Sequence, residues 1–242
     1  PSTPTSSEYP PLTFFDASLL QSGEYHDWLV QGFILSLQLL VASFVIALPL
    51  GVAIALMRTS TSRALRAIGA SLVEGVRNVP LLAHLLFWYF AFPELLPEPV
   101  KLALYNSNRE FICAAIALSL YAGVHMAEDI RSGIRAVPAA QMEAARSLGL
   151  GRMASLRLVL LPQSIRIAVP PLLSQTVNLW KDTSVATVIG AAEMMYQAAR
   201  VETATFRSVE AFTFATLAYL TVSLAISLAA QLYARRFPVR TV

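Results

Sequence analysis

The sequence predicts an all-helical (all-α) membrane protein with five transmembrane helices. Hydrophobic residues make up 56% of the 242 residues and charged residues only 14%, whereas a soluble domain carries about 25% charged residues. Two apolar runs, residues 29–57 and 211–234, contain no charge, and each exceeds the roughly 20 residues that a helix needs to cross a bilayer. Arginines cluster between the apolar runs, as is typical of the cytoplasmic loops of membrane proteins.

The N-terminal segment, residues 1–27, is expected to lie outside the membrane on the extracytoplasmic side. It contains Glu8, Asp16, Glu24 and Asp27 but no Lys or Arg. Residues 1–11 are rich in Pro, Ser and Thr, and residues 12–27 are expected to form a short helix at the outer surface. The first apolar run begins too late and is too long for a cleavable signal peptide. We therefore expect the first transmembrane helix to act as its own insertion signal.

Three shorter apolar runs supply the second, third and fourth helices. They cover residues 78–93, residues 111–127, and residues 167–180, the last continuing past Lys181 and Asp182 into residues 183–192. Each is long enough if charged residues are allowed at its ends or toward a protein interior. Five crossings place the two chain ends on opposite sides of the membrane.

The arginines orient these helices, because short cytoplasmic loops carry an excess of Lys and Arg. Arginines follow the first helix, the third helix and the fifth helix, which makes these three segments, and the C-terminus, cytoplasmic. The residues concerned are Arg58, Arg63, Arg66, Arg131, Arg135, Arg146, Arg152, Arg157, Arg166, Arg235, Arg236 and Arg240. Because the arginines are spread over loops and do not form one patch with interleaved aromatics, the sequence favours membrane lipid and not nucleic acid as a partner.

A short helix-turn-helix is predicted in the cytoplasmic loop at residues 138–162. Glu143, Ala144 and Ala145 open a helical run, Gly149 and Gly151 end it, and the next apolar segment begins at Leu161 and Pro162. With Val159, the spacing resembles the EAA loop of the membrane subunits of ABC importers. The preceding Pro138 and Gln141 also match the usual approach, except that Ala140 replaces a Gly.

The resemblance implies that this loop is a coupling helix that fits a cleft on an ATP-hydrolysing subunit. The residues that inherit this role are Gln141, Glu143, Ala144, Ala145, Gly149, Leu161 and Pro162. Small Ala side chains allow close backbone approach, and Gly149 allows the sharp reversal. The alternative is an ordinary cytoplasmic helical hairpin.

Two more motifs are similar to those of permeases for polar amino acids. One is Glu74, Arg77, Pro80, Leu81 and Leu82 at the entry to the second helix, where His84 stands in place of the usual Gln. The other is Lys181-Asp182-Thr183-Ser184. The resemblance covers about the last four-fifths of the chain and implies one permease domain, residues 28–242, with the type I ABC importer permease fold.

Polar residues inside the predicted helices are candidates for a substrate pathway. Ser174, Asn178 and Lys181 fall at i, i+4 and i+7, with Gln175 and Asp182 beside them, and lipid would reject such a stripe. A backbone break at residues 181–184 would offer N–H groups to a carboxylate. The alternative is hydrogen bonding between helices.

The pair Glu74 and Arg77 is three residues apart, and hence on one helical face. It is either an internal salt bridge or a contact to substrate. His84 is a further candidate of the pathway, or it only packs.

His125, Glu128 and Asp129 have the spacing of metal ligands, but they are too few for a closed site. The single Cys113 allows no disulfide within the chain. The sequence contains no P-loop and no hydrolase motif, so we expect no enzyme activity and no cofactor in this chain. ATP and Mg²⁺ would bind to a partner ATPase.

The resemblance further implies a multi-pass subunit of the bacterial inner membrane that forms half of a pathway. The implied partners are a cytoplasmic ABC ATPase dimer, a second permease, identical or paralogous, and a periplasmic amino acid binding protein. Residues 130–136 and 183–193 look most similar to glutamate and aspartate permeases, although Arg, His, Gln or cystine would suit the same scaffold. Rival hypotheses are a secondary transporter or channel not driven by ATP, and a membrane scaffold.

Overall fold

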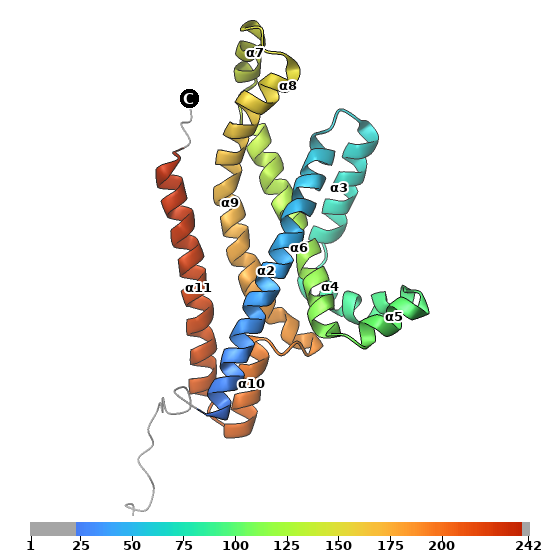
Figure 1. Cartoon of the computed structure of the whole chain (residues 1–242), viewed down its shortest axis with the longest axis vertical. Helices are drawn as coiled ribbons and strands as arrows, with labels where there is room; N and C mark the ends of the chain where they lie inside the picture. The colour runs from blue at the N-terminus through green and yellow to red at the C-terminus, as the bar shows by residue number, and fades with distance from the viewer. Residues whose placement is uncertain (1–22, 239–242) are drawn as a thin grey trace, which may run out of the picture.

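The structure, a computed structural model, describes residues 23–238, and every regular element in that range is a helix. The predicted all-helical fold is confirmed (Figure 1). Four segments are long and apolar enough to cross a membrane: 24–59, 109–135, 152–189 and 208–236. The expectations for residues 1–22 and for Arg240 lie outside the described residues.

Helices α2 (Glu24–Thr59) and α6 (Arg109–Arg135) cross closely at the centre of the molecule. A Cβ atom on Gly51 of α2 would stand 2.9 Å from the carbonyl oxygen of Gly123 on α6, so only glycine permits this approach. The surface of α6 around this crossing is rich in buried alanines, among them Ala114, Ala117 and Ala122. Small residues are expected here because lipid tails are as apolar as Leu, so helices in a membrane associate through close packing.

The second pass is built from two pieces, which differs from the prediction. Helix α3 (Arg63–Arg77) follows α2 directly, whereas the sequence predicted only a cytoplasmic segment with arginines and a helical face at Glu74 and Arg77. Regular structure resumes at α4 (Leu81–Leu86). A π-helical turn (Phe87–Ala91) and a 3-10 turn (Phe92–Leu95) continue α4. The predicted start of this helix at residue 78 is therefore wrong, because Pro80 is itself extended, with a ψ of 142°, and a proline disfavours a helical residue before it. The apolar helix 81–95 alone is shorter than the four spans.

A short helix, α5 (Glu98–Tyr105), projects sideways from the bundle (Figure 1). Arg109 at the start of α6 anchors its far end, since the guanidinium carbon lies 4.0 Å from the ring centroid of Tyr89 and 4.3 Å from that of Tyr105. Lys101 donates a hydrogen bond to Glu94, and this bond lowers the pKa of the Glu94 carboxyl. The loop between the second and third passes is thus held as a small folded unit.

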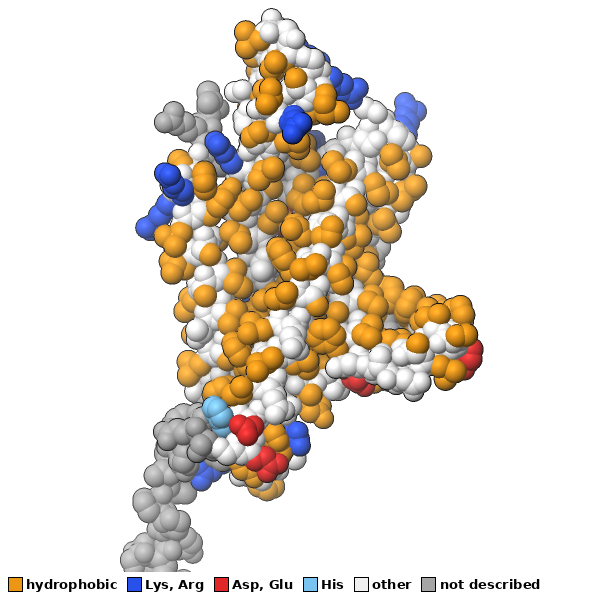
Figure 2. All heavy atoms as spheres, in the orientation of Figure 1, with side chains coloured by type: hydrophobic (Ala, Val, Ile, Leu, Met, Phe, Trp, Pro, Cys, Tyr) orange, Lys and Arg blue, Asp and Glu red, His pale blue; other side chains and the backbone are white. Residues whose placement is uncertain are grey.

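The remaining helices run along the bundle twice, first in α9 (Leu161–Asp182) and then back in α11 (Ser208–Arg236) (Figure 1). They are α7 (Ala139–Ser147), α8 (Arg152–Ser155), a π-helical turn (Leu156–Leu160), α9, a 3-10 helix (Thr183–Ile189), α10 (Met194–Thr205) and α11. Helices α7 and α8, the turn between α2 and α3, and the end of α11 lie at one end of the molecule, whereas α5 and α10 lie at the other (Figure 1). Most Lys and Arg side chains on the face in Figure 2 gather at the first end, and hydrophobic side chains cover the middle.

Candidate coupling tip and translocation face

The helix-turn-helix predicted at residues 138–162 is present at the arginine-rich end. We call residues 138–155 the coupling tip. Helix α7 begins after Pro138, whose carbonyl accepts a hydrogen bond from the N–H of Gln141 at 3.0 Å. It ends at Ser147, and Gly149 in the following turn has a left-handed φ of 83°. The N–H of Leu150 then reaches back to the carbonyl of Ala145 at 3.1 Å, which closes the turn in the way typical of glycine-terminated helices.

The coupling tip presents apolar side chains to its surroundings. Leu148 is 82% exposed and Met153 is 74% exposed. Ala145 is buried, and the hydroxyl of the buried Ser155 donates to the carbonyls of Leu150 and Gly151, which fixes α8 against the turn. Large exposed apolar groups on a rigid turn are typical of a surface that binds a protein.

The other predicted coupling residues surround this surface. Glu143 and Ala144 are exposed on α7, as is Gln141. Leu161 and Pro162 begin α9, and both are exposed. The tip is therefore joined to the long helix α9 through a π-helical turn without a flexible loop. A displacement of the tip would therefore also displace the start of α9.

An ion-pair cluster lies on α6 near the arginine-rich end. The carboxylate of Glu128 lies 2.8 Å from the guanidinium of Arg58 and 2.6 Å from that of Arg131. These two ion pairs neutralise the carboxylate of Glu128. Glu128 was one of the three metal ligands considered from the sequence, with His125 and Asp129. Within residues 23–238, no three His, Cys, Asp or Glu side chains lie close enough together to hold a metal ion.

The predicted salt bridge between Glu74 and Arg77 does not form. In the described part of the chain, Glu74 instead accepts a hydrogen bond from Asn78 at 3.2 Å, and both Glu74 and Arg77 are exposed. Asn78 is the C-cap residue of α3, and its side chain folds back to the carboxylate one turn earlier. The assignment of this pair to the substrate pathway stays a prediction.

His84 is tied to the interruption between α3 and α4. Its Nε2 lies 3.0 Å from the carbonyl oxygen of Val76, and a carbonyl only accepts, so Nε2 carries the proton. The imidazole thereby adds a further hydrogen bond to a carbonyl at the end of α3 that also accepts from the N–H of Val79 at 3.3 Å. This position explains why a polar residue is useful here, and its place in a substrate pathway also stays a prediction.

The polar stripe on α9 is present and open. Ser174, Asn178 and Lys181 are exposed, while Gln175 is half-buried and accepts a hydrogen bond from Asn178 at 3.3 Å. In the most apolar 18-residue stretch of the segment 152–189, only 11% of the residues are buried in the described bundle. An open polar stripe in a membrane helix needs a second protein surface or water against it.

The backbone at residues 181–184 does not break, contrary to prediction. Helix α9 tightens into the 3-10 helix, and the N–H of Thr183 still bonds to the carbonyl of Leu179. The hydroxyls of Thr183 and Ser184 donate to the carbonyls of Trp180 and Lys181 at 2.8 and 2.7 Å. Asp182 is half-buried at the junction. A carboxylate ligand would therefore meet side chains here and not free N–H groups.

Glu193 is an important buried residue that the sequence reasoning missed. It caps the start of α10 and is fully buried. Its carboxylate accepts hydrogen bonds from Ser36 of α2 at 3.2 Å, from Tyr219 of α11 at 2.7 Å, and from the N–H groups of Met195 and Tyr196. Burial raises the pKa of this carboxyl. One side chain thus joins helices α2, α10 and α11.

A helical bundle with an open polar stripe and an exposed apolar tip at its arginine-rich end defines a membrane component of a transport assembly. The chain belongs to the family described as binding-protein-dependent transport system inner membrane component, whose model matches residues 12–238. The predicted resemblance to ABC importer permeases of the polar amino acid type is confirmed.

Several relatives match nearly the whole chain. It is 33% identical over 216 residues to the glutamate/aspartate import permease protein GltJ of Escherichia coli (strain K12), covering 88% of each chain. It is 34% identical over 225 residues to the probable glutamine ABC transporter permease protein GlnM of Bacillus subtilis (strain 168). The match covers 93% of this chain and 96% of GlnM. A solved amino acid ABC transporter with histidines gives a TM-score of 0.78 at 30% identity, covering 92% of this chain and 100% of that one.

Proposed function

We propose that this chain is the membrane-spanning permease subunit of an ATP-driven importer of polar amino acids, with glutamate and aspartate as substrates. The observation that carries the proposal is the exposed apolar coupling tip, joined rigidly to a helix whose polar stripe is open. The family match supports the role in transport, and the names of GltJ and GlnM support the amino acid class.

The assembly that follows contains two permeases, because one chain leaves α9 open. In our proposal the coupling tip is cytoplasmic and is held by an ABC ATPase dimer, which binds ATP and Mg²⁺. A binding protein delivers the amino acid at the end with α5 and α10, and the complex lies in a bacterial inner membrane. Closure of the ATPases moves the tips, and α9 tilts as a rigid element between two packings.

The alternative function is a secondary transporter or channel that is not driven by ATP. Such a protein would have no use for an apolar surface outside the membrane at the arginine-rich end. Leu148 and Met153 provide that surface in this chain. The hypothesis of an ATP-driven importer therefore accounts for this exposed apolar surface, which the alternative leaves unexplained.

Uptake by the reconstituted assembly tests the proposal. Proteoliposomes should contain the permease, with its ATPase on the luminal side and its binding protein added outside. They should accumulate labelled glutamate in the lumen only when the lumen contains ATP. Aspartate should compete better than glutamine, arginine or histidine. Accumulation without ATP would favour the alternative, and stronger competition by arginine or histidine would contradict the acidic substrate.

Replacement of Lys181 with glutamine is expected to lower uptake about tenfold or more at an unchanged amount of membrane protein. A lost charge-assisted contact to a carboxylate costs roughly 1.5–3 kcal/mol, and Lys181 is exposed on the open face of α9. The matched control is Lys101→Gln, because Lys101 is the only other lysine in the sequence and lies on the projecting loop. Equal uptake by the Lys181 variant and the parent would remove Lys181 from the pathway.

A further inference from the structure

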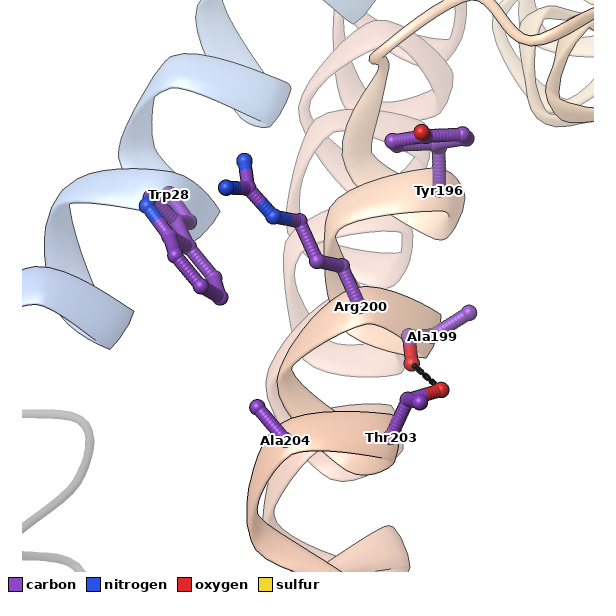
Figure 3. A pocket seen from close by; sticks show the side chains of 6 residues that line it. All are labelled: Trp28, Tyr196, Ala199, Arg200, Thr203 and Ala204. Carbon is purple, nitrogen blue, oxygen red and sulfur yellow. Dashed lines mark hydrogen bonds between the residues drawn. The ribbon is translucent and has the colours of Figure 1, made fainter.

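A pocket of about 490 Å³ opens between the start of α2 and helix α10, at the end opposite the coupling tip. It lies away from the stripe on α9 and has no role in the proposed transport step. The residues that line it are Trp28, Tyr196, Ala199, Arg200, Thr203 and Ala204. Figure 3 shows the Arg200 side chain reaching from α10 toward Trp28 on α2.

Arg200 provides unused hydrogen-bond donors in this pocket. Its guanidinium carbon stands 3.5 Å from the ring centroid of Trp28, so the indole holds the planar group in place by a cation–π contact. Within residues 23–238 the guanidinium makes no hydrogen bond or ion pair, and the hydroxyl of Tyr196 makes no hydrogen bond. By contrast, the hydroxyl of Thr203 is used, since it donates to the carbonyl of Ala199 at 2.9 Å.

The charge in the pocket lining favours an anion, and the acids of the first turn of α2, Glu24 and Asp27, lie outside that lining. Among the lining residues within 23–238, Arg200 is the only charged one. Glu202, the nearest acid on α10, accepts a hydrogen bond from Ser208 and forms no ion pair with Arg200 in the described structure. A guanidinium presents a fixed fork of N–H groups that matches the two oxygens of a phosphate.

The position of Trp28 places the pocket at the membrane surface. Trp28 directly precedes the uncharged apolar run of residues 29–57. Tryptophan at the end of such a run prefers the level of the lipid headgroups. The guanidinium stacked on it therefore lies at the depth of lipid phosphates, and Ala199 and Ala204 leave an apolar wall beside it.

We propose that this pocket binds the phosphodiester headgroup of an anionic phospholipid in the outer leaflet. Arg200 binds two phosphate oxygens, and Tyr196 donates its hydroxyl to the headgroup. The depth favours lipid over an acidic side chain of the binding protein, which approaches from beyond the headgroups. A bound lipid fastens α10 to the start of α2, at the end where Glu193 already joins α2, α10 and α11.

Native mass spectrometry of the purified full chain, titrated with short-chain phosphatidylglycerol, tests this site directly and does not depend on transport. The parent should bind the first phosphatidylglycerol molecule about tenfold more tightly than Arg200→Gln. Arg200→Lys should fall between them because it keeps the charge but loses the fork. Arg63→Gln, which removes an exposed arginine at the start of α3 at the opposite end of the molecule, should bind like the parent. Equal thermal unfolding of the variants controls for folding.

Three results would overturn the proposal. The first is equal affinity of Arg200→Gln and the parent for phosphatidylglycerol. The second is complete displacement of the lipid by millimolar inorganic phosphate, which would indicate a site for a free anion. The third is loss of binding-protein association in Arg200→Gln with lipid binding unchanged, which would make the pocket a protein contact.

Discussion

Replacement of Gly149 with valine is expected to abolish coupled uptake, with a loss of at least tenfold, while the chain still inserts into the membrane. Gly149 has a φ of 83°, a conformation that costs a β-branched residue about 1–3 kcal/mol. A Cβ atom there would meet nothing within 4 Å, so the cost comes from the backbone and not from a clash. The turn would rearrange to relieve it, and Leu148 next to it would leave its docking position.

The measurement is uptake together with ATP hydrolysis in the reconstituted assembly, where hydrolysis should persist and uptake should fall. Two matched variants serve as controls. Gly149→Asn should retain most uptake, because Asn tolerates the left-handed conformation. Gly151→Ser should also retain it, because Gly151 has a φ of −66° and open space around it. Normal uptake by Gly149→Val would remove the turn from the coupling mechanism.

Replacement of Glu193 with alanine is expected to destabilise the folded chain by about 3–5 kcal/mol. The carboxylate is buried and accepts hydrogen bonds from two helices and from two N–H groups at the start of α10. Its removal leaves several buried donors without a partner, each at a cost of roughly 1–3 kcal/mol. Thermal unfolding of the purified chain in detergent should show a strongly lowered midpoint.

Glu202→Ala provides the matched control for Glu193→Ala. Glu202 lies on the same helix, and it accepts an exposed hydrogen bond from Ser208. We expect its replacement to cost no more than about 1 kcal/mol, and Glu193→Gln to fall between the two alanine variants because the amide keeps an acceptor. A midpoint for Glu193→Ala within the range of the control would show that the buried network does not hold α10 in place.

The long spans and the coupling tip could be predicted because their signals are local. Helices α2 and α11 contain uninterrupted apolar runs, and the turn at Gly149 follows from a glycine after a helical run. The full extent of helix α3 was not predicted because only Gly69 and Val73 in it are buried, while its first arginines indicated a cytoplasmic segment between two spans. Val73 shares a buried hydrophobic cluster with Ile54 of α2 and Val124 of α6, and no local pattern reports such a tertiary cluster.

The candidate site was predicted in part for the same reason. The stripe of Ser174, Asn178 and Lys181 follows from helical spacing alone. Glu193 was missed because its partners, Ser36 and Tyr219, are 157 and 26 residues away in the sequence. The predicted break at residues 181–184 failed because the hydroxyls of Thr183 and Ser184 bond to nearby carbonyls and keep the helix closed.

The labelling of a cysteine at position 148 tests the central claim most directly. The only natural cysteine, Cys113, is buried, so Leu148→Cys provides a single exposed thiol at the coupling tip. A membrane-impermeant maleimide should label it in inside-out vesicles, should not label it in intact cells, and should be blocked when the partner ATPase is bound. Labelling from outside intact cells, or labelling that the bound ATPase does not reduce, would contradict a cytoplasmic tip held by an ATPase.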